Sequence, residues 1–277
     1  MKYSIGRILV ITVMMLPLMW SCGGSGEQND NQGKDTVVVN ADSLNANTGE
    51  AFRIPPPVDL FIFMRDQGVA FQTDLVNPVD NAAKYNTQVS KAVNFGVYAA
   101  DLAYCAFNEN NQKTADYYVT TKGLADDLGI SKGFNQEVTD RIDKNINNSD
   151  SLYAITKEAY WTAYDQVEAN DELKILPFIN IGSWMESLYI AVNSVQKFDA
   201  KSEVLAMIID QKLILETLLD YLDNIQQSEN LKTYSAKLIE LNGTWEPIMK
   251  NEDVLVTEEQ FIALKTKVNE IRQQIIL

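Results

Sequence analysis

Two apolar stretches decide the fold of this chain: residues 94–107 read NFGVYAADLAYCAF, and residues 175–192 read ILPFINIGSWMESLYIAV. Drawn as helices, both are apolar on every side, and each carries one formal charge, Asp101 in the first and Glu186 in the second. A helix that is apolar all round is enclosed by other elements. We therefore expect these stretches to form the two central helices of the protein.

The two stretches also share a short pattern in which an asparagine precedes a glycine by two positions. The matching residues are Asn94 with Gly96 and Asn180 with Gly182. Glycine lets another backbone approach closely, so we expect both glycines at helix contacts. The shared pattern has two explanations, an internal duplication or two core helices with similar packing needs.

Outside these stretches, apolar residues recur at i, i+3 and i+4 without sustained alternation of period two, which is typical of α-helices. Spacing and turn residues predict helices over 58–65, 80–107, 111–128, 132–147, 150–169, 171–197, 200–227, 230–241 and 257–276. Gly129 should end the third helix, and Ser131 should cap the fourth. Thr257 and Gln260 fit a capping box. The sequence thus predicts an all-α domain over 51–277, a single bundle of eight or nine helices.

The amino terminus has the pattern of a bacterial lipoprotein signal peptide, residues 1–21. Lys2 and Arg7 precede an apolar run over 8–20, which at about 13 residues is shorter than the roughly 20 that a membrane helix needs. The run ends in Leu-Met-Trp-Ser-Cys, so we expect Cys22 to be acylated. A cleaved secretory signal with an incidental cysteine is the alternative.

Residues 22–50 are predicted to be a flexible tether that carries the lipidated cysteine, because Gly, Ser, Asn, Asp and Gln dominate them. After cleavage, 21 basic and 38 acidic residues give a net charge of −17. Anionic headgroups repel such a body, so the acyl chains on Cys22 must hold it at the membrane. Gly23 follows the cysteine instead of an inner-membrane retention aspartate, which favours the outer membrane.

Composition excludes several function classes. The chain of 277 residues contains no histidine, which excludes Ser-His and Cys-His nucleophile pairs, an imidazole base and histidine-ligated metals. The net charge of −15 argues against nucleic acid as a partner, because phosphates are neutralised by basic surfaces. We expect no cofactor and no bound metal, and Cys105 is expected to be an inert buried thiol.

The lone acids of the central helices are the sharpest chemical feature, because neither Asp101 nor Glu186 has a cation three or four positions away. Helical spacing places other polar residues on stripes with the acids: Asn94 and Tyr98 with Asp101, and Ser183, Tyr189 and Asn193 with Glu186. Facing each other, the stripes would line a buried polar pocket, with Arg65 or Arg141 as counter-charge. Three interpretations stay open, a structural hydrogen-bond network, a ligand pocket and an acid–base pair.

Two apolar faces are further candidates for binding. The helix predicted over 150–169 carries an aromatic strip that is typical of a core face but also suits sugar stacking or a partner helix: Tyr153, Tyr160, Trp161 and Tyr164. The last helix carries an apolar face that would suit a partner groove: Phe261, Leu264, Val268 and Ile271.

Five motifs follow one another along the chain: RIPPP (53–57), LVNPV (75–79), KYNT (84–87), NFGVYAADLAY (94–104) and GSWMESLY (182–189). In this order they resemble an uncharacterised all-helical lipoprotein family of Bacteroidetes type. The resemblance covers about residues 53–200. It implies a helical fold and an envelope location, and it supplies no activity.

Three functional hypotheses follow from these observations. The first is a non-catalytic, lipid-anchored helical module of the cell envelope that binds an unidentified protein or small-molecule ligand. The second is a hydrolase that uses the carboxyl groups of Asp101 and Glu186, which requires both acids to open into a cleft. The third is a purely structural interaction module with its partner groove among the C-terminal helices.

Overall fold

The structure, a computed structural model, describes residues 58–276 except 109, 146–147, 170–173, 226–227 and 252–254. The described residues belong to one compact unit that spans residues 44–277. The predicted signal peptide 1–21, the acylation site Cys22 and the tether 22–50 lie outside the described residues.

Every regular element among the described residues is helical, which confirms the predicted all-α class. The elements are α1 (Val58–Asp66), η2 (Val79–Lys84), α2 (Gln88–Phe107), α3 (Asn111–Leu128), η3 (Ser131–Phe134), α4 (Gln136–Lys144), α5 (Ser149–Ala169), α6 (Leu176–Ser194), α7 (Glu203–Asn224), α8 (Glu229–Asn242), α9 (Glu246–Met249) and α10 (Glu258–Ile276), where η denotes a 3-10 helix. None of the described helices has the length and hydropathy of a membrane span.

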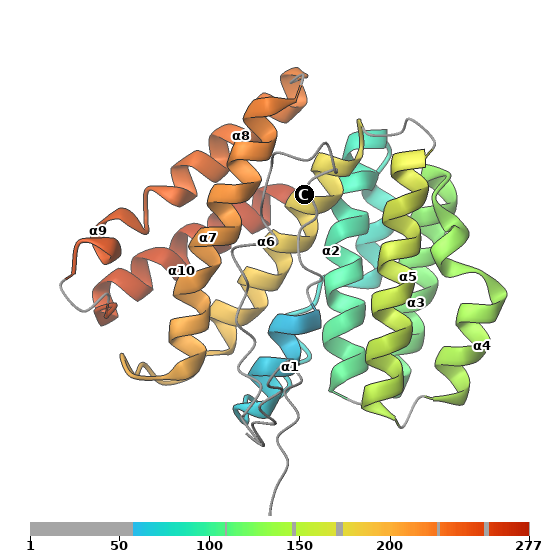
Figure 1. Cartoon of the computed structure of the whole chain (residues 1–277), viewed down its shortest axis with the longest axis horizontal. Coiled ribbons are helices and arrows are strands. Elements are labelled where there is room, and N and C mark those ends of the chain that lie inside the picture. The colour runs from blue at the N-terminus through green and yellow to red at the C-terminus, as the bar shows by residue number, and fades with distance from the viewer. Residues whose placement is uncertain are drawn as a thin grey trace, which may run out of the picture. The chain divides into compact units, whose positions relative to one another are not determined.

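The predicted central helices are α2 and α6, which contact each other more extensively than any other pair of described elements. Figure 1 shows α6 between two groups of helices, with α2, α3, α4 and α5 on one side and α7, α8, α9 and α10 on the other. Nearly all side chains of α2 and α6 are buried. The apolar character of both sequences on every side is thus explained by neighbours on every side.

Gly96 and Gly182 set the distance between the two central helices. A Cβ on Gly182 would lie 1.9 Å from the Val93 carbonyl oxygen, and one on Gly96 would lie 2.2 Å from the Ile179 carbonyl oxygen. Each glycine therefore faces the carbonyl of the residue three positions before the other glycine. This reciprocal contact explains why each helix has a glycine at this position.

Helix ends follow the predicted capping signals in part. Gly129, with a left-handed φ of 75°, ends α3 as predicted. The predicted capping box at α10 is present, since the Gln260 backbone N–H donates to the Thr257 hydroxyl and the Thr257 backbone N–H donates to the Gln260 side chain. Asn135, and not Ser131, caps α4.

Several predicted boundaries were wrong. The helix expected over 80–107 is divided into η2 and α2. Thr87 forms a capping box with Ser90, so a new helix begins after Thr87. The stretch 242–256, between the helices predicted over 230–241 and 257–276, contains the one-turn helix α9, which has a proline in its first turn.

Candidate functional site

The two acids of the central helices are both fully buried and lie next to each other. Asp101 and Glu186 are each 0% exposed, and the Glu186 carboxyl group acts electrostatically on Asp101. The polar stripes of α2 and α6 therefore face one another at this level of the bundle. A buried carboxylate must be paired, hydrogen-bonded or protonated, and the two acids meet this requirement differently.

Arg272 of α10 neutralises Glu186. Its Nε donates to Glu186 Oε2 at 2.9 Å, and its Nη2 donates to Oε1 at 2.6 Å. The guanidinium carbon lies 4.3 Å from the centre of the Tyr189 ring, a cation–π distance. Burial lowers the pKa of Arg272, but the Glu186 carboxylate outweighs this effect, and the pKa rises.

The predicted counter-charges were wrong. Arg65 pairs with the neighbouring Asp66 at 2.9 Å, and Arg141 pairs with Glu158 at 2.7 Å, both on the protein surface. Their side chains are about one-third exposed, whereas Arg272 is 8% exposed. The counter-charge thus comes from the helix farthest along the chain.

The surroundings of Asp101 favour its protonated form. Its Oδ2 accepts the Asn77 backbone N–H at 3.1 Å, and its buried Oδ1 has no hydrogen bond from an N–H or O–H donor. Burial and the Glu186 carboxylate raise the pKa of Asp101 well above its usual value, against the opposing effects of Arg272 and the Asn77 N–H. Asp101, Glu186 and Arg272 form a buried cluster, here called the buried triad. With the proton on Asp101 and the ion pair between Glu186 and Arg272, we infer that the triad carries no net charge.

Asn77, which sequence analysis did not single out, anchors the segment before η2 against this triad. It is 0% exposed. Its carbonyl accepts from the Tyr117 hydroxyl at 2.7 Å, and its side-chain amide donates to the Tyr85 hydroxyl at 3.1 Å. The position of Asn77 before a proline, in the uncharged stretch 75–79, is a weak signal that sequence alone does not separate from an ordinary turn.

Apart from Ser183, the other residues of the predicted polar pocket have partners of their own. Tyr98 donates to the Pro78 carbonyl at 2.8 Å. Asn94 donates to the carbonyls of Ser90 and Ile275, and Asn193 donates to Asn269 Oδ1 at 2.7 Å. Ser183 is buried, and its hydroxyl has no hydrogen-bond partner. Of the seven predicted residues, the structure brings Asp101, Glu186 and Tyr189 together around Arg272.

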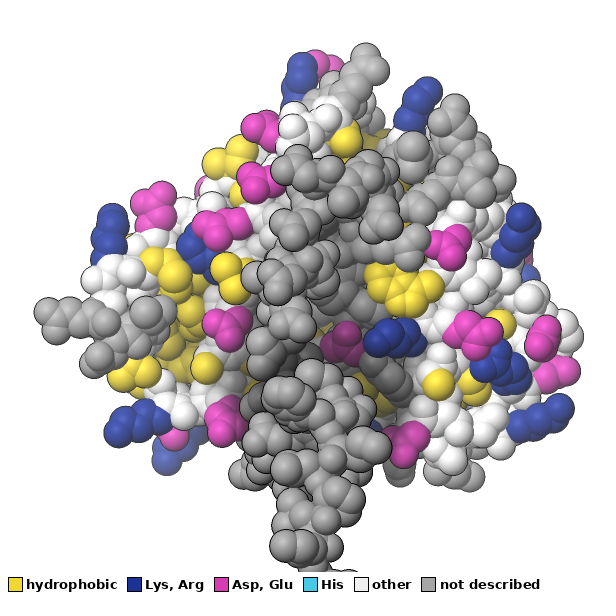
Figure 2. Space-filling view, in the orientation of Figure 1, with side chains coloured by type: hydrophobic (Ala, Val, Ile, Leu, Met, Phe, Trp, Pro, Cys, Tyr) yellow, Lys and Arg dark blue, Asp and Glu magenta, His cyan; other side chains and the backbone are white. Residues whose placement is uncertain are grey.

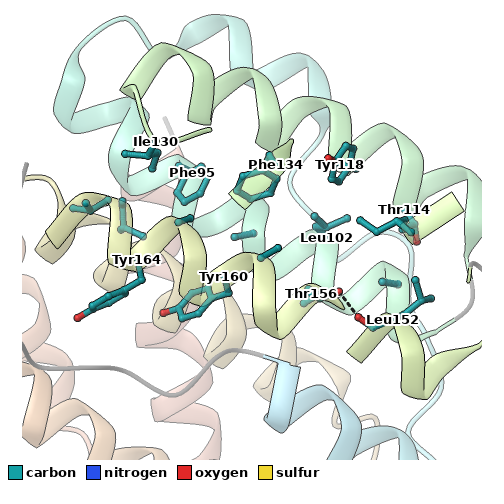
Figure 3. Close-up of a pocket in the computed structure, with 18 of the residues that line it drawn as sticks. Phe95, Leu102, Thr114, Tyr118, Ile130, Phe134, Leu152, Thr156, Tyr160 and Tyr164 are labelled. Carbon is teal, nitrogen blue, oxygen red and sulfur yellow. Dashed lines mark hydrogen bonds between the residues drawn. The ribbon is translucent and has the colours of Figure 1, made fainter. Parts of the chain in front are cut away.

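A second feature is an apolar cavity of about 50 Å³ between α2, α3, η3 and α5, with α4 and α6 at its ends. None of the seven residues of the predicted polar pocket lines it. Figure 3 shows the lining side chains of α2 and α5 in two facing rows. Both rows have the spacing of one face of a helix. They consist of residues 95, 99, 102, 103 and 106 on α2, and residues 152, 156, 159, 160, 163, 164 and 167 on α5.

The hydroxyl groups of Thr114, Tyr118 and Thr156 around this cavity are bonded within the protein, whereas the hydroxyl of Tyr160 is buried without a hydrogen-bond partner. Thr156 donates to the Leu152 carbonyl at 2.7 Å, and Thr114 donates to the Asn110 carbonyl at 2.9 Å. Tyr118 shares a hydrogen bond of 2.6 Å with Thr139. The phenol oxygens of Tyr160 and Tyr164 point away from the row on α2 (Figure 3). A cavity with such walls stays dry and suits an apolar occupant.

The aromatic strip of α5 has one face on this cavity. Tyr160, Trp161 and Tyr164 contact one another, with ring centres 5.1 to 6.3 Å apart, and Tyr160 and Tyr164 line the cavity. The side chain of Tyr153 lies outside the described residues.

The apolar face of α10 is not a partner groove. Phe261, Leu264, Val268 and Ile271 are between 0% and 4% exposed, because α10 packs on α6, α8 and α2. The expectation of an open groove at this face was therefore wrong.

Comparisons with known proteins give no relative for this chain: no family model, no curated protein and no solved structure matches it.

Proposed function

We propose that this protein is a lipid-anchored protein of the cell envelope, held at the outer membrane by acyl chains on Cys22, whose helical domain binds a small apolar molecule without catalysis. The observation that carries the proposal is the apolar cavity between α2, α3 and α5, at which the hydroxyls of Thr114, Tyr118 and Thr156 are already bonded within the protein. Ligand sites are concave and predominantly apolar. The buried acids, which the sequence placed in a candidate ligand pocket, are assigned instead to the scaffold that holds α2 in place.

The arrangement of the buried triad supports binding over hydrolysis. A general acid or base must come within hydrogen-bonding distance of its substrate. Asp101 and Glu186 are 0% exposed, and both oxygens of Glu186 accept hydrogen bonds from Arg272. The carboxyl pair therefore has the properties of a structural network that fixes the packing of α2, α6 and α10.

Surface charge supports the expectation that nucleic acid is not the partner. Figure 2 shows acidic and basic side chains interspersed over the described residues of one face. With a net charge of −15 for the chain, such a surface does not concentrate the cations that phosphate binding needs.

Native mass spectrometry of the protein purified from membranes of the bacterium that makes it tests both halves of the proposal. We expect a mass above that of residues 22–277 by covalent acyl groups, and a noncovalent apolar adduct in addition. Ala159→Val adds two methyl groups to the cavity wall, and the exposed Ala154 on the same helix gives the matched control Ala154→Val. The adduct should fall at least tenfold in Ala159→Val and persist in Ala154→Val.

Two results would contradict the proposal. An unacylated chain removes the membrane anchor. A chain that carries no adduct, or the same adduct in all three proteins, removes the cavity as a binding site.

A further inference from the structure

One face of α6 carries buried polar groups that have no partner. Asn180 and Trp184 lie four positions apart, on the same face of the helix, and are 0% and 3% exposed. Among the described residues, neither atom of the Asn180 side-chain amide and no acceptor for the Trp184 indole N–H takes part in a hydrogen bond. Buried polar groups in folded proteins are nearly always hydrogen-bonded, because leaving them unpaired is costly. A partner for these groups must therefore come from outside the described residues.

The neighbouring helix α5 adds a third group of this kind. The Tyr160 hydroxyl is buried without a hydrogen bond among the described residues, and Figure 3 shows that it points away from α2. Tyr160 and Ile179 line the same cavity, which places Tyr160 near the turn of α6 that holds Asn180. Burial raises the pKa of Tyr160, so its hydroxyl keeps its proton and can donate. Tyr160, Asn180 and Trp184 are here called the α5–α6 seam.

The chain enters the described structure beside this seam. The first helix, α1, begins at Val58 and packs on α6. Figure 1 shows α1 beside the C-terminal half of α6, with its first turn toward the N-terminal half. Gln72, shortly after α1, donates its side-chain amide to the Ser194 carbonyl at 3.5 Å, at the C-terminal end of α6. The residues that precede Val58 therefore start next to the face that carries Trp184 and Asn180.

These preceding residues have the chemistry that the seam lacks. They read Arg-Ile-Pro-Pro-Pro (53–57), a sequence that favours the polyproline II conformation. That conformation has no internal hydrogen bonds, so each carbonyl can accept one from a partner. Five such residues span about 16 Å at about 3.1 Å each, which exceeds the about 6 Å between Asn180 and Trp184 along α6. Aromatic side chains are the usual surface on which polyproline II segments bind.

We propose that the α5–α6 seam binds the chain's own proline segment, residues 53–57, in the polyproline II conformation. Its carbonyls accept hydrogen bonds from the Tyr160 hydroxyl, the Trp184 indole N–H and the Asn180 amide, and its proline rings pack on the two aromatic rings. A backbone N–H before the prolines donates to Asn180 Oδ1. The bound segment fixes the point at which the predicted tether leaves the helical domain, and so determines which side of the domain faces the membrane.

Trypsin digestion of the full chain, followed by mass spectrometry, tests this assignment at the bond after Arg53. Tyr160→Phe and Trp184→Phe each keep an aromatic ring and delete one donor. Each should speed cleavage of this bond about fivefold, the fold-change that corresponds to a hydrogen bond of about 1 kcal/mol. Tyr118→Phe is the matched control, because Tyr118 lies on α3 and shares its hydrogen bond with Thr139. The control should leave the rate after Arg53 unchanged.

A variant of the segment itself completes the test. Pro56→Gly combined with Pro57→Gly removes the preference for polyproline II and keeps Arg53 and the two residues after it. It should speed cleavage after Arg53 at least tenfold, and it serves if Trp184→Phe fails to fold. Cleavage after Lys34, in the predicted tether, is the internal reference and should be equal in all proteins.

Two results would overturn the docked segment. One is a double proline variant that is cleaved after Arg53 no faster than wild type. The other is Tyr160→Phe cleaved no faster than Tyr118→Phe, which would leave the unpaired groups of the seam to bound water. Neither result bears on the acyl anchor or on the adduct in the native mass spectrum, so the proposed function is decided separately.

Discussion

Replacing Arg272 with methionine should lower the free energy of unfolding by about 3–5 kcal/mol, because the substitution leaves the Glu186 carboxylate buried without its cation. Glu186 is 0% exposed, and both of its oxygens accept hydrogen bonds from Arg272. Urea unfolding of the full chain, followed by circular dichroism, measures the loss.

Arg65→Met is the matched control for this prediction. Arg65 pairs with Asp66 at the surface, and surface pairs contribute about 0–1 kcal/mol. Adding Glu186→Gln to Arg272→Met removes the stranded charge and should restore part of the lost stability. Equal losses in Arg272→Met and Arg65→Met would show that the buried triad does not hold α10 to the central helices.

Gly182→Ala should cost about 3 kcal/mol or more, the upper end of the range for an overpacked core. The new Cβ would lie 1.9 Å from the Val93 carbonyl oxygen, and the atoms it meets belong to the backbone of α2. Backbone atoms cannot turn aside as a flexible side chain does, so the central helices must move apart.

Gly123→Ala is the control for the intrinsic effect of glycine in a helix. Gly123 is exposed on α3, and a Cβ there meets nothing within 4 Å. That substitution should stabilise the protein by about 0.5–1 kcal/mol. If urea unfolding shows that both substitutions stabilise the protein, the close approach of α2 and α6 at Gly182 would be contradicted.

The sequence predicted those features of the fold that depend on local pattern. The continuous apolar character of α2 and α6 identified the central helices, and the lone charges of Asp101 and Glu186 identified the buried acids. Each of these signals lies within about twenty consecutive residues. The boundary between η2 and α2 was missed because the capping box of Thr87 and Ser90 uses serine where glutamate or glutamine is usual.

The remainder of the site depends on long-range pairing that the sequence does not encode locally. Arg272 meets Glu186 across 86 positions, and its position in the apolar stripe of α10, between Val268 and Ile275, was the one signal for it. The cavity is lined in part by alanines of α2 and α5. Alanine is common on every kind of helix face, so its absence of bulk becomes informative only when the facing helix is known.

The central claim is that the acids in the core form a closed, neutral triad, with the proton on Asp101. The unfolding free energy of wild type and Asp101→Asn between pH 4 and pH 8 tests it most directly. An unfolded aspartate titrates near about pH 3.9, and burial raises the pKa of Asp101 in the native state. The native state therefore binds more protons above pH 4, and wild type should lose stability as the pH rises.

The side-chain amide that Asp101→Asn introduces cannot titrate, so the stability of wild type relative to the variant should fall by about 1.4 kcal/mol per pH unit until the native pKa is reached. Asp210, whose pKa burial also raises, is present in both proteins and cancels in the difference. A difference that stays constant with pH, or that favours wild type increasingly as the pH rises, would mean that Asp101 is ionised in the folded protein, and the neutral triad would be wrong.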